Sequence, residues 1–498
     1  MELQFKKKTC NYVRELVCQC AERELTDEIR LTESMDDIGR VLGAWGQVLI
    51  RGKEWRPDRV AVSGGVMVWV LYMPENSTQP QMTEAWMPFH EQWGIEDTQH
   101  DGSIIVTGHL TFCDARSVSA RKLMVRAGLC LDVHVYAPDS EDLYVPEQLP
   151  ENVQVQTVCY PVLLPAEAGE KSFTLEEQLP IPSGMPRLQK LLRYNLLPQI
   201  METRVSGGRV IFRGVGILHV LAMDEEGQLH SFDMDLPFSQ YAQLEGGFSP
   251  DAQSDVTMAV TGLELEPDEE GQLRLKAGLT GQYLVDDREW VETVSDAWSP
   301  FRQIQVQQQS VNLPSVLDSR RENIYGEQTL PIQTDVVADA SLLPDFPRIR
   351  REENGMTLEQ SAMAQILSYD RDGQLRGTSH RMEAAGTVKA DEAAELSAVA
   401  LGGSMQLSDQ GDSMLVRAEV PVQMVSTAGE GISMVTALAL GEKQEPDPGR
   451  PSLILRRAAG DPLWDIARQS GSTVEAIRRA NALDGEPEPG RMLLIPVV

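Results

Sequence analysis

The residues best suited to chemistry in this 498-residue chain are seven histidines, six cysteines and 75 acidic side chains. The chain has no Gly-x-x-x-x-Gly-Lys-Ser/Thr loop, and Gly214-Val215-Gly216 lacks the third glycine of a dinucleotide-binding turn. The histidines form no His-Glu-x-x-His pair, the spacing that places two zinc ligands on one helix face. They are scattered as His90, His100, His109, His134, His219, His230 and His380. We therefore expect no catalytic residues, no metal site and no cofactor.

The six cysteines lie in the first third of the chain and form no Cys-x-x-Cys pair. They are too sparse for a disulfide framework, so reduced thiols are expected. Cys130 lies in an alternating apolar run, which predicts a buried position. Cys18-Gln19-Cys20 could ligate a metal ion, but no histidine stands at ligand spacing from it.

The abundance of carboxylates leaves one enzymatic alternative open. A glycosidase needs two carboxyl groups at a defined separation, one of them acting as an acid. Nothing in the sequence singles out such a pair, so we expect a protein that is not an enzyme. A deep pocket with converging carboxylates would instead favour a hydrolase in the β-rich part of the chain.

The charge of the chain argues against two classes of direct partner. Its formal net charge is −31, and residues 1–451 carry all of it. Such an acidic chain is poorly suited to nucleic acid or to an anionic membrane surface. The longest apolar run, Val62–Met73, is too short to span a bilayer. Met1–Cys10 lacks the apolar segment of a secretory signal, so we expect a cytoplasmic protein without membrane insertion.

The C-terminal residues predict a small domain of two strands and two helices. Leu453–Leu455 is a short apolar run that can form a strand, and Met492–Ile495 can form a strand that returns beside it. Between them, Asp461 is a suitable N-cap for a helix that starts at Pro462. Ser472-Thr473-Val474-Glu475 is a capping-box pattern for a second helix. The expected order is therefore strand, helix, helix, strand.

The order of these landmarks over residues 446–498 resembles a LysM domain. In that family the loop before the first helix and the loop after the second flank a shallow groove that binds N-acetylglucosamine polymers. The resemblance implies that the residues binding a partner or a glycan are Gly460, Asp461, Pro462, Leu463, Trp464, Asn481 and Leu483.

Several of these residues also have a structural interpretation. Leu463 has the spacing of a core residue, Asn481 can brace the chain after the second helix, and Trp464 suits either role. Pro462 stands where the family usually has threonine or serine, which removes a hydroxyl and a backbone donor that a sugar could use. This difference favours a protein partner, with peptidoglycan as the alternative.

An internal repeat organises the rest of the chain. The apolar segment Val60–Tyr72 is similar to Val210–Ala222 and, more weakly, to Met356–Ser368, at offsets of 150 and 146 residues. Alternating segments recur at similar spacing as Met124–Leu129, Arg274–Leu279 and Leu415–Val420. A period of two predicts strands, so the pattern predicts a mainly β chain of three tandem antiparallel β-sandwich-like modules.

We place the three modules at residues 21–164, 165–312 and 313–445. Residues 1–20 are predicted to form a short helix or a frayed arm. Met35–Leu42 and Met185–Leu192, each ahead of a long strand, are predicted to form single helices.

Three acidic modules followed by a LysM-like domain resemble the SPOCS-domain spore coat morphogenetic proteins of the SipL type. The third copy departs most from the pattern, with Gln360 and Ser361 in place of glycines. The resemblance implies a non-catalytic scaffold in spore coat assembly, in the mother-cell cytoplasm at the forespore surface. It also implies that the LysM domain binds a spore-envelope morphogenetic ATPase of the SpoIVA type.

Overall fold

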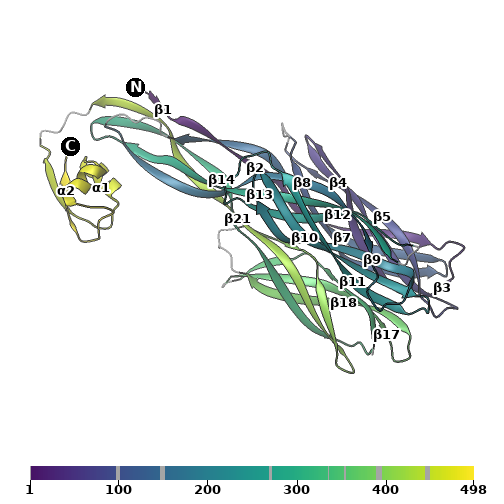
Figure 1. The fold of residues 1–498 in the computed structure, drawn as a ribbon. Coiled ribbons are helices and arrows are strands. Elements are labelled where there is room, and N and C mark those ends of the chain that lie inside the picture. Colours follow the sequence, from purple (N-terminus) through teal and green to yellow (C-terminus); the bar gives the residue numbers. More distant parts are fainter. Residues whose placement is uncertain are drawn as a thin grey trace.

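The structure is a computed structural model that describes residues 2–96, 101–145, 152–268, 272–334, 336–352, 355–388, 395–443 and 449–498. Antiparallel strands make up most of these residues, and the two helices among them are short and lie near the C-terminus (Figure 1). The mainly β fold is therefore confirmed. Neither of the described helices is long and apolar enough to cross a membrane.

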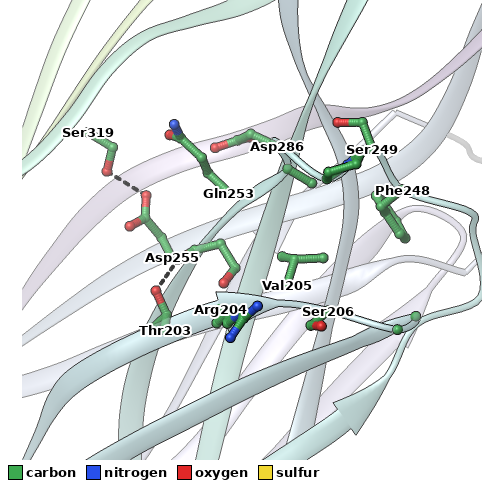
Figure 2. Close-up of a pocket in the computed structure, with 15 residues that line it drawn as sticks. Thr203, Arg204, Val205, Ser206, Phe248, Ser249, Gln253, Asp255, Asp286 and Ser319 are labelled. Carbon is green, nitrogen blue, oxygen red and sulfur yellow. Dashed lines mark hydrogen bonds between the residues drawn. The ribbon is translucent and has the colours of Figure 1, made fainter.

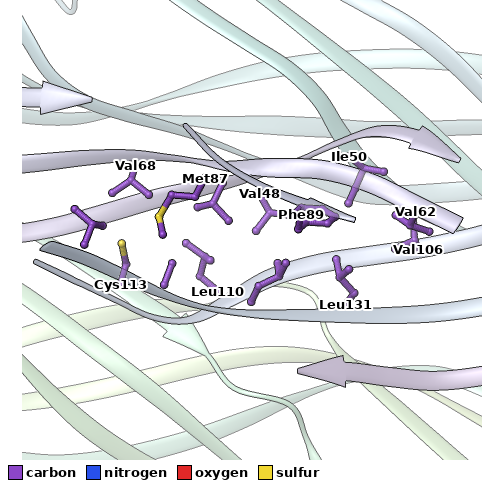
Figure 3. Close-up of a cluster of buried hydrophobic side chains, with 14 of the residues drawn as sticks. Val48, Ile50, Val62, Val68, Met87, Phe89, Val106, Leu110, Cys113 and Leu131 are labelled. Atoms are coloured by element: carbon purple, nitrogen blue, oxygen red, sulfur yellow. The ribbon is translucent and has the colours of Figure 1, made fainter. Parts of the chain in front are cut away.

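The first module is a sandwich of two antiparallel sheets. Its strands are β2 (Lys6–Arg30), β3 (Ile38–Arg56), β4 (Arg59–Pro74), β5 (Gln81–Gly94), β6 (Ser103–Ser119) and β7 (Lys122–Val145). One sheet has the order β2-β7-β6 and the other β3-β4-β5. Apolar side chains from both sheets, including Val62, Met87, Val106 and Leu131, form the core between them (Figure 3).

The second module repeats this arrangement. Its strands are β8 (Gln154–Leu179), β9 (Leu188–Val205), β10 (Arg209–Asp224), β11 (Leu229–Gln243), β12 (Gln253–Pro267) and β13 (Leu273–Trp298). The sheet β12-β13-β8 faces the sheet β11-β10-β9. Phe212, Phe238 and Leu279 are among the side chains buried between the two sheets.

The third module is the same sandwich with shorter, interrupted edge strands. Its strands are β14 (Arg302–Leu330), β15 (Val336–Pro344), β16 (Arg348–Glu352), β17 (Gly355–Tyr369), β18 (Leu375–Val388), β19 (Glu395–Ala400), β20 (Ser404–Asp409) and β21 (Met414–Lys443). In one sheet β17 pairs with β15, β16 and β18. In the other, β21 pairs with β14, β19 and β20, and also with the N-terminal strand β1 (Glu2–Gln4).

The three modules meet in a buried apolar cluster that we call the hub. It contains Leu71, Leu221 and Leu367, which occupy the same position in the three copies of the repeat. The neighbouring Val70 instead points into the core of its own sandwich, because successive side chains of a strand face opposite ways. The other buried members are Leu42, Trp45, Leu192, Met223 and Leu375. No module buries this face alone, so the modules stabilise one another.

Long strand pairs extend past the three sandwiches and share a second core, which we call the stalk. The pairs are β2 with β7, β8 with β13, and β14 with β21. An isolated two-stranded ribbon is at best marginally stable, so three ribbons that bury one set of side chains stabilise each other. That set is Cys10, Tyr12, Leu143, Val162, Leu164, Val291, Val311, Leu313, Ile432 and Met434. The stalk leads toward the C-terminal domain (Figure 1).

Each ribbon has a bulge where the stalk joins its sandwich. The strand register shifts between Glu15 and Val17, between Val285 and Asp286, and between Val316 and Asp318. A bulge adds one residue to one strand, bends it and changes the face on which the next side chains lie. The three bulges therefore change the face on which the side chains at the base of the stalk lie.

The C-terminal domain has the expected order of strand, helix, helix, strand. Its elements are β22 (Leu453–Arg457), α1 (Leu463–Ser470), α2 (Val474–Asn481) and β23 (Met492–Pro496). Thr473 caps α2, since its hydroxyl accepts the backbone N–H of Ala476 at 3.0 Å. Ile466, Ile477 and Ile495 are buried together between the helices and the sheet. Residues 446–448 of the expected domain lie outside the described residues.

Three local predictions are wrong. Residues 6–20 are neither a helix nor a frayed arm, because they belong to β2 and pair with β7. Met35–Leu42 and Met185–Leu192 do not form helices, because β3 and β9 begin within them. β2 pairs with the distant strand β7, whereas β3 and β9 each pair with the strand that follows them, and this pairing outweighs the local helical pattern.

The expected module boundaries fall inside long strands. The division at residues 20/21 lies in β2, that at 164/165 in β8 and that at 312/313 in β14. Alternation of polar and apolar residues marks a strand but not the module to which a ribbon belongs. From the strand pairing we propose that the modules divide between β7 and β8 and between β13 and β14.

Candidate functional site

The loop before α1 holds its predicted binding residues in internal contacts. Gly460 has a φ of +98°, a conformation that suits glycine. Asp461 does not cap the helix; its Oδ2 lies 2.6 Å from Nη2 of Arg456. Pro462 is the N-cap residue, and the carboxylate of Glu486 accepts the N–H of Leu463 at 2.7 Å. The expected cap at Asp461 is therefore wrong, because a more distant carboxylate supplies it.

The loop after α2 is likewise tied to the domain core. The Nδ2 of Asn481 donates to the carbonyls of Ile477 and Leu494 at 2.8 and 2.6 Å, and its Oδ1 accepts the N–H of Leu494 at 2.7 Å. These bonds hold the end of α2 against β23. Leu463 is fully buried in the same core, and Leu483 packs against it. The contacts support the structural interpretation of Asn481 and Leu463, and a binding role for them stays a prediction.

Trp464 joins the C-terminal domain to the stalk. Its ring lies edge-on to that of Trp298, with centroids 6.5 Å apart and an interplanar angle of 85°. Its indole N–H donates to Oδ2 of Asp296 at 3.1 Å, and Arg468 contacts the same oxygen at 2.6 Å. Trp464 is therefore occupied by the end of β13 in this arrangement.

The outer face of the small sheet is apolar and exposed. Leu453, Leu455, Met492 and Leu494, which we call the LysM strip, have exposed fractions between 36% and 65%. Leu455 pairs with Leu494 across the two strands, so their side chains lie on the same face. The helices cover only the opposite face of the sheet. A signal for this strip is present in the sequence, since both strands are apolar at consecutive positions.

A second candidate site is a polar pocket of about 630 Å³ in the second module (Figure 2). Asp255 and Asp286 line it, from β12 and β13. Oδ2 of Asp255 accepts a hydrogen bond from Ser319 at 2.5 Å. Asp286 is only 3% exposed, and its Oδ1 has no hydrogen-bond partner among the described residues. Burial, and then the nearby charge of Asp255, raise the pKa of Asp286 to about 8.

This pocket brings together the two carboxyl groups that the sequence did not single out. The raised pKa of Asp286 favours its protonated form at neutral pH, and Asp255 accepts a hydrogen bond, which is an unequal pairing of the kind used in acid–base catalysis. The pocket is therefore where a hydrolytic activity has to be tested.

The fold also brings histidines to carboxylates. His134, His219 and His230 each have a ring nitrogen 2.6 to 2.8 Å from a carboxylate oxygen. No sequence motif marks these carboxylates, because each lies on a different strand from its histidine. His100 lies outside the described residues.

Comparison with known proteins gives two family matches. A family model described as "SipL, SPOCS domain" matches residues 187–267, which hold β9 to β12 of the second module. A LysM domain model matches residues 458–496. Both are binding domains without known catalytic chemistry, and LysM domains are associated with glycan or peptidoglycan binding. No curated protein and no solved structure matches the chain.

Proposed function

We propose that this chain, a sporulation-related protein with a SPOCS domain and a C-terminal LysM domain, is a non-catalytic adaptor in spore envelope assembly. The first and third sandwiches repeat the strand pairing of the second, so we infer that they are SPOCS modules as well. Together they form an acidic body that holds the LysM domain at the end of the stalk. In this proposal the LysM domain binds a partner protein and the body recruits or positions others.

The exposed LysM strip is the observation that carries the proposal. An apolar face on a small domain is favourable only when something covers it, and protein partners with apolar surfaces do so. The loop residues that a glycan would use are tied up by Glu486, by Leu494 or by the stalk residue Asp296. The available contact surface is therefore the sheet rather than the loops.

The partner and the location follow from the family resemblance. We propose a spore-envelope morphogenetic ATPase of the SpoIVA type as the partner. The chain would act in the mother-cell cytoplasm, at the surface of the forespore. The net charge of −31 supports a protein partner over nucleic acid.

Replacing Leu455 with glutamate is expected to weaken binding to the purified ATPase at least tenfold, because it places a charge in the middle of the apolar strip. Isothermal titration calorimetry with the intact chain measures the affinity. Gln469→Glu is the matched control, since it adds the same charge on α1, where Oε1 of Gln469 accepts a hydrogen bond from Arg456 at 2.9 Å. Equal affinity of Leu455→Glu and the original chain would contradict the proposal.

Peptidoglycan is the second candidate ligand, and the LysM match is the observation that favours it. Sedimentation of the intact chain with insoluble peptidoglycan separates the two candidates. The adaptor proposal expects little sedimentation. Strong sedimentation that persists in Leu455→Glu, with no affinity for the ATPase, would make glycan binding the function.

The absence of catalysis is tested at the pocket of the second module. The original chain, Asp286→Asn and Asp255→Asn are expected to release the same background of soluble products from cell-wall glycans. A higher release that both substitutions abolish would show a hydrolase, because each removes one of the two carboxyl groups.

A further inference from the structure

We propose that the first module binds a divalent transition-metal ion, zinc by preference, through Glu15, Cys18 and His134. The three side chains lie at the bulge where the ribbon of β2 and β7 leaves the sandwich. Their ligand atoms all lie within 4.8 Å of one another. The site is independent of the LysM domain and of the proposed adaptor function.

The bulge is what brings the three ligands together. Cys18 and His134 are direct partners across β2 and β7, so their side chains lie on one face of the sheet. Glu15 is three residues before Cys18 and would face the other way in a regular strand. The register shift between Glu15 and Val17 adds the residue that returns it to the face of Cys18. The Oε1 of Glu15 consequently lies 2.6 Å from Nδ1 of His134.

A buried carboxylate orients the imidazole for this role. Asp132 is 6% exposed, and its Oδ2 lies 3.1 Å from Nε2 of His134. When Nε2 carries the proton donated to Asp132, Nδ1 is free to bind a metal ion on the side of Glu15 and Cys18. A carboxylate behind a histidine ligand is a regular feature of protein metal sites. The ring also stacks on Tyr136, with an interplanar angle of 7°.

The ligand types select the metal. A thiolate, an imidazole and a carboxylate suit zinc, with bonds of about 2.0 to 2.3 Å, and do not suit magnesium or calcium. Glu15 and Cys18 are exposed, so the ion can enter from solvent and both side chains can move the short distance needed to bind it. Three protein ligands leave a fourth tetrahedral position for water.

A neighbouring thiol pair supplies the competing site. The Sγ atoms of Cys20 and Cys130 lie 2.6 Å apart on the same pair of strands. A metal bound there would have two sulfur ligands, whereas the proposed site has one. The two sites are therefore distinguishable by the number of sulfur atoms around the metal and by substitution.

Cobalt(II) titration of the intact, reduced, metal-free chain tests the proposal, followed by zinc competition. The expected result is a thiolate-to-cobalt charge-transfer band that zinc abolishes, and X-ray absorption of the zinc form showing one sulfur ligand. Cys18→Ser should remove the band, and its exposed position lets the variant fold. Asp132→Asn should keep the band but weaken zinc binding by about 10- to 100-fold, because it only positions His134.

Cys159→Ser and Cys20→Ser are the controls, and both should keep the band. Cys159 is an exposed thiol on β8, outside the cluster. A band that survives in Cys18→Ser, or that disappears in Cys20→Ser, would overturn the proposal. So would two sulfur ligands in the zinc form, or the lack of any band at cobalt concentrations up to about one millimolar.

Discussion

Replacing Asp339 with asparagine is expected to lower the free energy of unfolding by about 3 to 5 kcal/mol, because it breaks a buried ion pair from one side. Nε of Arg193 lies 2.7 Å from Oδ2 of Asp339, and the two side chains are 3% and 0% exposed. Oδ1 of Asp339 also lies 2.9 Å from Nε2 of His219 and accepts the hydroxyl of Ser231 at 2.9 Å. The substitution would leave the guanidinium charge of Arg193 buried without a counter-charge.

The lost stability comes from the contact between the three modules. Arg193 belongs to the second module, its guanidinium lies 4.9 Å from the ring centre of Trp45 of the first, and Asp339 belongs to the third. Calorimetry measures the stability, and hydrogen exchange should show faster exchange in β15 than in β2 of the first module, which packs against β7 and β8 instead. Asp233→Asn is the control, since Asp233 also contacts His219 at 2.6 Å but is 63% exposed. Asp233→Asn should lower the free energy of unfolding by less than about 1 kcal/mol.

Two further measurements separate the ion pair from simple loss of packing. Arg193→Met combined with Asp339→Leu should be more stable than Asp339→Asn alone, because no buried charge remains. Burial lowers the pKa of His219, but hydrogen bonds to Asp233 and Asp339 outweigh it and leave the pKa raised. The stability that His219 contributes is therefore full below its unfolded pKa of roughly 6.5 and is lost as the pH rises through the higher folded value. The Asp339→Asn penalty should accordingly shrink toward alkaline pH.

The internal architecture of each module was accessible from the sequence, whereas the association of the modules was not. Alternation along Val60–Tyr72 and its two copies identified the strands, and the spacing identified three modules. The same segments did not show that Leu71, Leu221 and Leu367 share one cluster, because periodicity says which face is apolar but not what covers it. An acidic chain likewise gives no sign that one of its many aspartates is the buried partner of Arg193.

The candidate sites were likewise only partly predictable from the sequence. The sequence marks Cys18 as a possible ligand, but the histidine that lies beside it is His134, on the strand that pairs with β2. Glu15 joins them only through a register shift that no local pattern marks. In the LysM domain the cap of α1 comes from Glu486, beyond the three-residue spacing of a capping box. Contacts across strands or between loops can be predicted only once the pairing of the strands is known.

Replacing Asp286 with asparagine is expected to stabilise the protein at alkaline pH and to have little effect in acid. Burial first, and the charge of Asp255 second, raise the pKa of Asp286 to about 8 in the folded chain. Its unfolded value is roughly 3.9, so the folded state keeps a proton that the unfolded state releases. Below about pH 4 the Asp286 carboxyl therefore does not lower the stability of the wild-type chain. As the pH rises from there through about 8, the wild-type chain loses stability. Each unit within this window costs about 1.4 kcal/mol, so the window of roughly four units sums to about 5.5 kcal/mol as an upper limit.

Asparagine has nearly the same shape as aspartic acid and does not titrate, so the Asp286→Asn chain does not lose this stability as the pH rises. Melting temperatures of Asp286→Asn and the wild-type chain, compared at about pH 4, 6 and 8, should diverge progressively, with the variant higher at pH 8 by the equivalent of at least about 2 kcal/mol. Asp251→Asn is the matched control, because Asp251 is exposed beside the same pocket and its replacement should have a small effect that does not grow with pH. A constant difference between Asp286→Asn and the wild type across this range would show that Asp286 is ionised in the folded protein. The orphaned Oδ1 would then require a cation or a donor from solvent, since an unpaired carboxylate buried to this depth is not stable.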